Sequence, residues 1–412
     1  MTTKPTYTPA LRFPDFLNDG EWEVKRLGEI TEVVNIRNKE NRILPIYSIN
    51  NKTGFVPQSE QFDGVDSNKR GYDTSLYKIV KSNTFAYNPA RINVGSIGYS
   101  GDIEECLISS LYVCFKTTND VDDLFLMCYF NTSSFLKSVE NSVEGGIRSY
   151  LFYENFSKIK IALPPLAEQR RIAACLSALD EMLAATNGKL EQLKAYKKGL
   201  MQKLFPAKGK KLPELRFKEF EKDGEWTMKK LGEVITEVKD TTTDFTNIPL
   251  YSLTIEEGIT AKTDRYERGF LVTKEDNVFK VVSPNDFVSN PMNLRFGAIG
   301  YNKNNFSVSV SGYYDVFRFK EYGVSVFWGN YLKSDLLLHK YDEIAIGSLL
   351  EKRRVYFSIL QNLEVLVPSL PEQRKIASYL SSMDETINAY TEKVGQLGQY
   401  KKGLMQQLFV NI

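Results

Sequence analysis

Residues that could carry out chemistry are sparse in this chain of 412 residues. The single histidine, His339, leaves little basis for a metal site or for a histidine general acid or base, and we expect it to be structural. No G-x-x-x-x-G-K-[ST] loop and no glycine-rich cofactor loop occurs, so neither ATP hydrolysis nor methyl transfer has a recognisable site. The nearest matches to an adenine-methylating Asn-Pro-Pro-aromatic tetrad are Asn88-Pro89-Ala90-Arg91 and Asn290-Pro291-Met292-Asn293, which lack the second proline and the aromatic residue. Because the motif occurs twice, it favours a structural turn or a DNA-facing loop over a catalytic site.

Composition points to an ordinary intracellular protein. The net charge of +2 and the charged fraction of 25% do not by themselves indicate nucleic acid as a partner. The cysteines occur in the first half only, which argues against a disulfide framework, and we interpret them as reduced; they are Cys106, Cys114, Cys128 and Cys175. The N-terminus lacks an apolar signal core, and no run of about 18 apolar residues occurs. We therefore expect a cytoplasmic protein with no membrane partner.

The elements that must position any functional residue are duplicated. Residues 163–206, which contain Glu168-Gln169-Arg170, return at 367–410 with Glu372-Gln373-Arg374, an offset of 204 residues. The same offset relates residues 9–29 to residues 213–233, each with a Gly-Glu-Trp turn and a Leu-Gly-Glu segment. Between these matching blocks the two halves barely resemble each other. The sequence thus predicts a doubled scaffold that carries two different inserts.

The inserts are predicted to be mixed α+β domains. Short runs rich in Tyr, Phe, Val and Ile are bounded by turn residues, as in strands. These runs are 77–80, 96–99 and 111–115 in the first half, and 280–282, 298–301 and 315–319 in the second. We predict globular domains at 1–163 and 207–367, separated by long helices at 164–206 and 368–412.

The two helices carry a heptad pattern of apolar residues. In the first helix the seam consists of Ile172, Leu176, Leu179, Leu183, Leu190, Leu193, Leu200 and Leu204, with Thr186 and Lys197 at the remaining positions. In the second helix it includes Ile376, Leu380, Met383, Ile387, Val394, Leu397, Leu404 and Leu408. A period of 3.5 predicts a coiled coil, and the partner is expected to be the other helix of the chain. Gly199 and Gly403 recur in this pattern and are expected to permit close approach of the two backbones. The alternative is two amphipathic helices that each lie on their own domain.

Duplication suggests a geometry for this pair. Equivalent halves tend to pack about a two-fold axis, which would make the helices antiparallel and would give the chain an internal pseudo-two-fold symmetry. A helix of about 38 residues is roughly 57 Å long. This layout suits a linear ligand with repeating features, and duplex DNA is the commonest. Because the inserts differ, the expected target is asymmetric, with two half-sites and an unread spacer.

The repeated motifs resemble those of the specificity subunit of type I restriction-modification systems. The resemblance is carried by the prolines before Glu168-Gln169-Arg170 and Glu372-Gln373-Arg374, and by Tyr-Lys-Lys-Gly-Leu-Met-Gln near the end of each helix. It covers essentially the whole chain, including the segment Gly145-Gly146-Ile147-Arg148-Ser149-Tyr150-Leu151. The second half departs from the family pattern there, so any role of Arg148 carries over only weakly to Arg353 or Arg354.

The resemblance implies a non-catalytic subunit that reads double-stranded DNA and recruits other chains. It implies two modification subunits, which methylate adenine with S-adenosylmethionine, and two restriction subunits driven by ATP with Mg²⁺. No cofactor is expected on this chain. The two target-recognition domains would read the DNA, and the helices would set the spacer and serve as a platform for the modification subunits.

Arg, Lys and Asn side chains match base edges and phosphates, so the divergent polar segments supply the candidate DNA contacts. In the first half they are Asn50, Lys69, Arg70, Arg91, Asn93 and Arg148. In the second half they are Arg265, Arg268, Asn293, Arg295, Arg353 and Arg354. Two other functions remain open: a chain that combines recognition with methyltransferase or nuclease activity, and a coiled-coil adaptor that binds no DNA. The missing cofactor loop speaks against the first, and the long, different inserts speak against the second.

Overall fold

The chain divides into two compact units, each assembled from two or more parts of the sequence. The computed structural model describes residues 7–61, 66–67, 71, 73–142, 150–261, 278–320, 324–349 and 353–412. Unit 1 consists of residues 1–187 and 392–412, and unit 2 of residues 188–391. Each unit therefore contains one globular domain, the first part of one long helix and the last part of the other.

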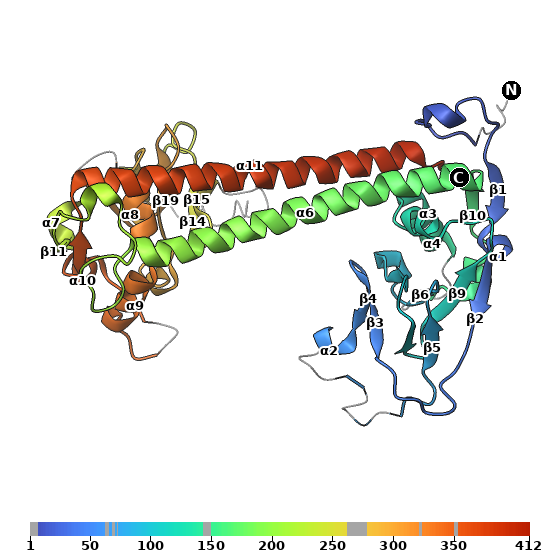
Figure 1. Ribbon diagram of the computed structural model, residues 1–412. Coiled ribbons are helices and arrows are strands. Elements are labelled where there is room, and N and C mark those ends of the chain that lie inside the picture. The colour runs from blue at the N-terminus through green and yellow to red at the C-terminus, as the bar shows by residue number, and fades with distance from the viewer. Residues whose placement is uncertain are drawn as a thin grey trace. The chain divides into compact units, whose positions relative to one another are not determined.

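The domain of unit 1 mixes short strands with short helices (Figure 1). Its helices are η1 (Pro14–Phe16), α1 (Leu27–Ile30), α2 (Gln58–Gln61), η2 (Ile92–Val94), α3 (Asp123–Phe130), α4 (Ser133–Ser142), α5 (Tyr153–Phe156) and the start of α6 (Leu166–Leu204). Its strands are β1 (Glu23–Arg26), β2 (Thr31–Val34), β3 (Tyr47–Asn50), β4 (Gly54–Pro57), β5 (Lys78–Lys81), β6 (Phe85–Tyr87), β7 (Ile97–Tyr99), β8 (Glu105–Ile108), β9 (Val113–Thr117) and β10 (Lys160–Leu163). A four-stranded antiparallel sheet has the order β2-β9-β6-β7, and the pairs β1-β10, β3-β4 and β5-β8 complete the domain.

The domain of unit 2 repeats this plan. Its helices are η3 (Lys218–Phe220), α7 (Leu231–Val234), η5 (Leu294–Phe296), α8 (Ser325–Tyr331), α9 (Asp335–Ile344), α10 (Phe357–Gln361) and the start of α11 (Leu370–Leu408). Its strands are β11 (Thr227–Lys230), β12 (Ile235–Glu237), β13 (Thr241–Thr242), β14 (Tyr251–Thr254), β15 (Gly258–Ala261), β16 (Phe279–Val282), β17 (Phe287–Ser289), β18 (Ile299–Tyr301), β19 (Val308–Ser311), β20 (Asp315–Phe319) and β21 (Glu364–Val367). The main sheet is again four-stranded, β12-β20-β17-β18, beside a three-stranded sheet β13-β16-β19 and the pairs β14-β15 and β11-β21. The α+β prediction is confirmed, and the six predicted strand segments overlap β5, β7, β9, β16, β18 and β20.

An antiparallel strand pair connects each domain to its long helix. In unit 1, Glu23 of β1 pairs with Leu163 of β10, and Pro164 and Pro165 then lead directly into α6. In unit 2, Thr227 of β11 pairs with Val367 of β21, just before α11. Proline suits this junction because it cannot continue the strand ladder and is tolerated in the first turn of a helix.

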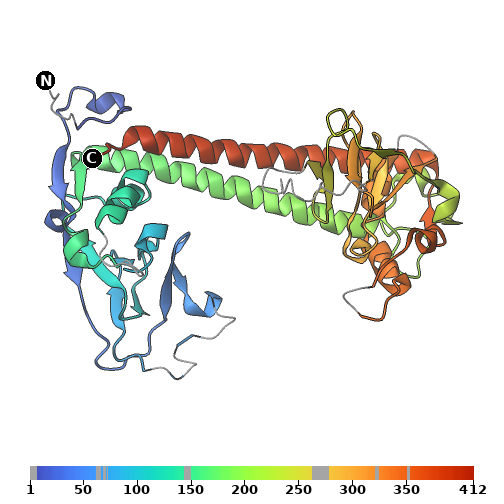
Figure 2. The same cartoon turned by 180° about the vertical axis from the view of Figure 1, so that it is seen from behind.

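Within each unit, the two long helices run side by side in opposite directions. In unit 1, Ile172 and Leu176 of α6 share one core with Leu408 and Phe409 at the end of α11 (Figure 2). In unit 2, Leu200 and Leu204 of α6 share a core with Ile376 and Leu380 near the start of α11. Pairing the start of one helix with the end of the other is antiparallel. Because these side chains also pack against the domain, helices and domain share one core in each unit.

The heptad seam is confirmed by its burial. No seam residue is exposed, and six of them, namely Ile172, Leu176, Leu190, Leu200, Ile376 and Leu380, are at most 6% exposed. The others are half-buried: Leu179, Leu183, Leu193, Met383, Ile387, Val394, Leu397 and Leu404. Thr186, the polar residue in the seam, is 8% exposed and its hydroxyl donates to the carbonyl of Met182 in the preceding turn. A satisfied hydroxyl can be buried at little cost.

The expected role of the two helix glycines is wrong. A Cβ added at Gly199 or Gly403 would meet no heavy atom within 4 Å, so neither glycine lies where the helices approach closely. The close approaches occur instead in the domains, where a Cβ at Gly28 would lie 2.8 Å from the Cβ of Ser157. The seam side chains, not the glycines, set how closely the helices approach.

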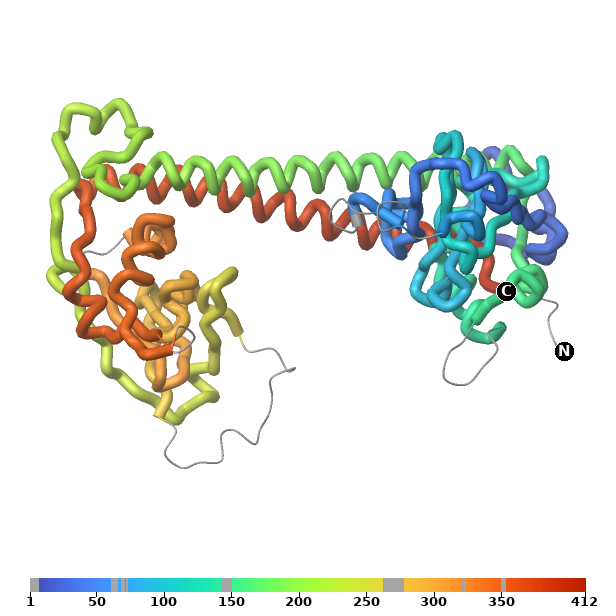
Figure 3. Tube along the Cα trace, turned by 90° about the horizontal axis from the view of Figure 1, so that it is seen from below, coloured from blue at the N-terminus to red at the C-terminus, as the bar shows by residue number. Residues whose placement is uncertain are grey.

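The segment that follows each long helix folds back over its end. In unit 2, the chain between α6 and β11 forms a loop (yellow-green in Figure 3), and the amide of Leu215 donates to the carbonyl of Lys203 at 2.9 Å. In unit 1, the amide of Leu11 donates to the carbonyl of Gln407 near the end of α11 at 3.0 Å. Both bonds satisfy carbonyls in the last turn of a helix, which have no acceptor role within the helix itself. The N-terminal segment thus caps α11 as the connecting segment caps α6.

Candidate nucleic-acid interface and the clamps beneath it

The two Asn-Pro motifs form the same turn. In each, the Oδ1 atom of the asparagine accepts a hydrogen bond from the amide two residues on: Ala90 for Asn88 and Met292 for Asn290, both at 3.0 Å. The turn closes on a glycine in the left-handed region, Gly95 at φ 83° in one copy and Gly297 at φ 92° in the other. Because these asparagine oxygens are committed to the turn, they are not available to bind a base amino group as a methyltransferase tetrad would.

The turn of unit 1 presents two candidate side chains to solvent. Arg91 and Asn93 are both exposed, on either side of the buried Ile92 that anchors η2. Asn50 lies at the end of β3, where its Oδ1 accepts from the amide of Lys52 at 2.8 Å. Asn50 is therefore partly used by its own hairpin, whereas Arg91 and Asn93 extend from a rigid turn.

The equivalent turn of unit 2 holds its candidates more firmly. Arg295 lies where Asn93 lies in unit 1, but its side chain is only 11% exposed and reaches Asp342 of α9 at 3.3 Å. Its guanidinium also lies 4.5 Å from the ring centroid of Phe296. Asn293, which takes the place of Arg91, is half-buried. The two turns thus share a backbone but present different side chains.

Arg353 and Arg354 lie near this turn and differ from each other. Arg353 donates to the carbonyls of Asp342 and Ala345, so it satisfies the free carbonyls at the end of α9. Arg354 pairs by its backbone with Ile346, and its guanidinium lies 5.7 Å from the ring centroid of Tyr313, an exposed residue of the β19–β20 hairpin. Of the two, Arg354 has the side chain better placed to contact a ligand.

The remaining candidates, Lys69, Arg70, Arg148, Arg265 and Arg268, lie outside the described residues. They stay predictions from the sequence. The described candidates come together only in part, with Arg91 and Asn93 on one turn and with Asn293, Arg295 and Arg353 around Asp342.

A buried clamp that the sequence reasoning missed fixes the first domain to its helix. Glu168, in the first turn of α6, accepts two hydrogen bonds from the guanidinium of Arg12, both at 2.8 Å, and a third from the indole of Trp22 at 3.2 Å. The side chains of Arg12 and Glu168 are 4% and 1% exposed. The bond to Glu168 raises the pKa of Arg12, so this guanidinium stays charged. Charge-assisted, bidentate bonds of this kind are the strong class of hydrogen bond.

Unit 2 contains the same clamp. Arg216 donates twice to Glu372 at 2.8 Å, and the indole of Trp226 donates to Glu372 at 3.2 Å. A signal for it was present in the sequence, since the arginine, the tryptophan and the glutamate each recur at the 204-residue offset. The Glu-Gln-Arg motif therefore owes its glutamate to burial and pairing, in addition to the favourable position of an anion at a helix N-terminus.

The glutamine of the motif is also structural. Gln169 donates to the carbonyls of Pro164 and Asp120, and it accepts from the amide of Asp122 at 2.8 Å. That amide belongs to the cap of α3, so one side chain connects the helix start to the domain. Gln373 makes the equivalent bond to Pro368 at 3.0 Å.

Each unit also pairs its two long helices through a lysine and an aspartate. In unit 2, Lys197, a seam residue, lies 2.5 Å from Asp384. In unit 1, Lys401 bonds to Asp180. A charged residue in a coiled-coil seam favours one register and orientation, because any other would bury it unpaired.

No described side chains form a group suited to holding a metal ion. His339 is exposed, and its Nε2 lies 3.0 Å from the Nζ of Lys208. The four cysteines are free thiols, and burial raises the pKa of Cys106 to about 12 and that of Cys114 to about 11. Both thiols are therefore protonated and unreactive at neutral pH. Among the described residues, no helix combines the length and the apolar character that a membrane crossing requires.

Comparisons with known proteins agree with this architecture. The family model of the type I restriction modification DNA specificity domain matches twice, at residues 19–195 and 223–396. The chain is 26% identical over 433 aligned residues to the type I restriction enzyme MjaVIII specificity subunit of Methanocaldococcus jannaschii, covering 97% of this chain and 93% of that protein. A putative MjaX specificity subunit from the same organism is 27% identical over 45% of each chain.

Two solved structures share the fold. A type I restriction-modification S subunit from M. genitalium has a TM-score of 0.58 at 14% identity, covering 98% of this chain and all of that one. A chain from a structure of type I restriction-modification complex assembly and conformational transition has a TM-score of 0.56 at 16% identity, with 94% and 97% covered.

Proposed function

This chain belongs to the family of type I restriction-modification DNA specificity proteins, and from that membership we propose that its two domains read two different half-sites of one DNA target. The observation that supports this most is the pair of Asn-Pro turns. They keep the same backbone bonds while their side chains differ, with Arg91 and Asn93 in one domain and Asn293 and Arg295 in the other. A common frame with different donors and acceptors suits two domains that bind the same polymer but different bases.

The two half-sites are separated by a spacer of fixed length in this proposal. A seam without exposed residues and the Lys–Asp pairs favour one register of the helices within each unit. The helices therefore set the distance, and the domains set the sequence.

The chain itself is non-catalytic in this proposal. The asparagine oxygens of the two turns are occupied by backbone amides, and the sequence contains no P-loop. S-adenosylmethionine, ATP and Mg²⁺ belong on partner chains. The partners are two modification subunits and two restriction subunits, one of each for each half of the doubled scaffold.

Mapping methylated adenines tests the target. We would express the chain with its modification subunit in a host that lacks other adenine methylation, and sequence the genome for modified bases. The expected result is one asymmetric motif with two half-sites and a constant gap. A symmetric or undivided motif would contradict the proposal.

A helix insertion tests the spacer. Adding four residues, roughly 6 Å of helix, to both α6 and α11 is expected to lengthen the gap and to leave both half-sites unchanged. A changed half-site sequence would show that helices and domains do not divide the task in this way.

Gel shifts test how the grip on DNA is shared. With a net charge of +2, the chain offers little excess positive charge for phosphates, so the chain alone should bind weakly and assembly with the modification subunit should raise the affinity. Equally tight binding by the lone chain would argue against shared phosphate contacts.

A further inference from the structure

One stretch of sequence is identical in the two long helices although packing does not require it. Tyr-Lys-Lys-Gly-Leu-Met-Gln occupies residues 196–202 and 400–406. Leu200 and Leu404 belong to the seam, which explains their identity. The lysines at 198 and 402 and the glutamines at 202 and 406 are exposed, and the exposed residues just before the stretch, 194–195 and 398–399, do differ. Identity at exposed positions points to a common ligand for the two units.

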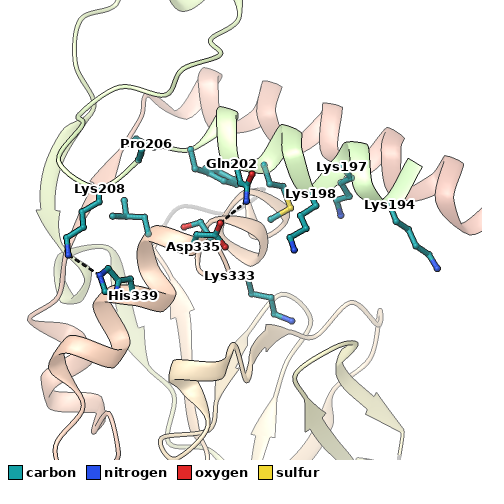
Figure 4. Close-up of a pocket in the computed structure, with 14 residues that line it drawn as sticks. Lys194, Lys197, Lys198, Gln202, Pro206, Lys208, Lys333, Asp335 and His339 are labelled. Carbon is teal, nitrogen blue, oxygen red and sulfur yellow. Dashed lines mark hydrogen bonds between the residues drawn. The ribbon is translucent and has the colours of Figure 1, made fainter. Parts of the chain in front are cut away.

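In unit 2 these identical residues line a pocket. It has a volume of about 720 Å³ and opens between the end of α6 and the start of α9. Its floor includes Met201, Phe205 and Leu336, and Lys198 and Gln202 lie at its edge (Figure 4). Gln202 is held there by a hydrogen bond from its Nε2 to Asp335 at 3.0 Å.

In unit 1 the equivalent residues line a second pocket. It has a volume of about 420 Å³ and lies between the end of α11 and α4. Met405 and Phe409 occupy the places of Met201 and Phe205, and Lys402 and Gln406 those of Lys198 and Gln202. The two units therefore contain the same kind of pocket, with an apolar floor and the same polar pair at its edge.

Both pockets are electropositive. Among the described parts of the chain, neither Lys198 nor Lys402 has an ion-pair or hydrogen-bond partner, although their neighbours Lys197 and Lys401 are paired with aspartates. Asp335 is the one acidic residue that lines the larger pocket, and no acidic residue of the described chain lines the smaller one. An unpaired ammonium above an apolar floor is complementary to a carboxylate that neighbours an apolar side chain.

We propose that the two pockets are equivalent docking sites for one acidic, amphipathic segment of the modification subunit, which is bound twice. An apolar side chain of that segment packs on Met201 and Phe205 in unit 2, and on Met405 and Phe409 in unit 1. A neighbouring carboxylate pairs with Lys198 or Lys402. The proposal rests on the proposed function for the identity of the partner.

The apolar floors favour a protein segment over a DNA phosphate. Phosphate contacts use lysine, arginine and backbone amides and gain nothing from a methionine or phenylalanine beneath them. A helix or strand that inserts an apolar anchor into a groove buries this floor, as in recurring modes of peptide recognition. The pockets also keep their residues while the Asn-Pro turns vary, as expected if the same partner binds to both.

The test counts modification subunits on the full chain. Native mass spectrometry of the purified complex is expected to show two modification subunits on the wild-type chain. Lys198→Glu or Lys402→Glu alone should leave one, because a like charge opposite the carboxylate lowers affinity at that site by at least about tenfold. The double variant should bind neither at the concentration that saturates the wild type.

Lys189→Glu with Lys393→Glu is the matched control. These lysines are equivalent, exposed and on the same helices, but they line neither pocket, so the control should bind two modification subunits. Circular dichroism should show equal helix content for all variants, since Lys198 and Lys402 are exposed.

Two outcomes would overturn the inference. One is a double variant that binds both modification subunits with unchanged affinity. The other is a double variant that binds both subunits but loses about tenfold in DNA affinity, which would assign the lysines to phosphate contacts. A wild-type complex that contains two modification subunits but methylates no split target would refute the proposed function and leave the docking inference standing.

Discussion

The Asn-Pro turns of the two units have the same backbone bonds, but their arginines are used differently. Arg91 in unit 1 is exposed, whereas Arg295 in unit 2 is bound to Asp342 and lies against Phe296. The clamps at the helix starts show the opposite behaviour, since Arg12–Glu168–Trp22 and Arg216–Glu372–Trp226 are nearly identical. The contrast teaches that duplication preserved the parts that join domain to helix and released the parts that extend from the domain surface.

The largest effect is expected from breaking a clamp. Glu168→Gln leaves the buried guanidinium of Arg12 without its counter-charge, which should lower the unfolding free energy of unit 1 by about 3–5 kcal/mol. Glu372→Gln should cost less, because Arg216 is more exposed, at 9% against 4%. Urea unfolding followed by fluorescence can separate the units, since Trp22 lies in unit 1 while Trp226 and Trp328 lie in unit 2.

Glu191→Gln is the control for this comparison. Glu191 pairs with Lys194 on the exposed face of α6, and such surface pairs contribute at most about 1 kcal/mol. If Glu168→Gln were no more destabilising than Glu191→Gln, the clamp would not be the joint between domain and helix.

The next effect concerns the two turns. Arg91→Ala should weaken DNA binding or relax one half-site position by about 1–3 kcal/mol, with unchanged thermal stability, because the side chain is exposed. Arg295→Ala should instead lower the stability of unit 2 by about 1 kcal/mol, since Asp342 and the Phe296 ring lose their partner. Binding assays and melting curves on both variants distinguish the two roles, and identical profiles would remove the contrast between the turns.

A smaller effect should depend on pH and be confined to unit 2. Asp315 pairs across the sheet with Ser289, and burial raises its pKa to about 6 from an ordinary value of 3.8. The folded state thus favours the neutral carboxyl, so the unfolding free energy of unit 2 should fall as pH rises from about 4 to 6. Because the group is partly exposed, solvent limits the change to about 1 kcal/mol.

Asp315→Asn should remove this pH dependence. In unit 1 the equivalent strand position is Val113, which pairs with Tyr87 and cannot titrate. The fluorescence of Trp226 and Trp328, followed during urea unfolding at pH 4 and pH 6.5, measures the change. A variant with the same pH dependence as the wild type would assign the effect to another group.

The smallest effect should come from the helix glycines. Gly199→Ala and Gly403→Ala should each raise stability by about 0.5–1 kcal/mol, because the added Cβ meets open space and alanine loses less entropy in a helix. Thermal melts of the isolated chain check this. A loss of stability at either position would mean that the backbone there needs glycine after all.

Much of the fold follows from short-range sequence patterns. The seam from Ile172 to Leu204 could be read from its heptad spacing, because side chains at that spacing must share one helix face. The turn role of Asn88 and Asn290 could also be predicted, since asparagine followed by proline favours a local bond to its own backbone. The clamp was harder to predict, because Arg12 and Glu168 are 156 residues apart and only their recurrence at a common offset relates them.

The sequence by itself determined the duplication, the two long helices, the α+β domains and the family. These depend on repeated motifs and on periodicity, which are local properties of the chain. The tertiary structure alone decided which polar residues are spent internally: Arg295 and Arg353 bind Asp342 and nearby carbonyls, whereas Arg91 remains exposed. It also decided that Gly199 and Gly403 face open space, and that Lys198 and Lys402 lie unpaired above apolar floors. The physical reason is that burial and pairing depend on neighbours that are distant in sequence, and composition does not reveal which side chains those neighbours will meet.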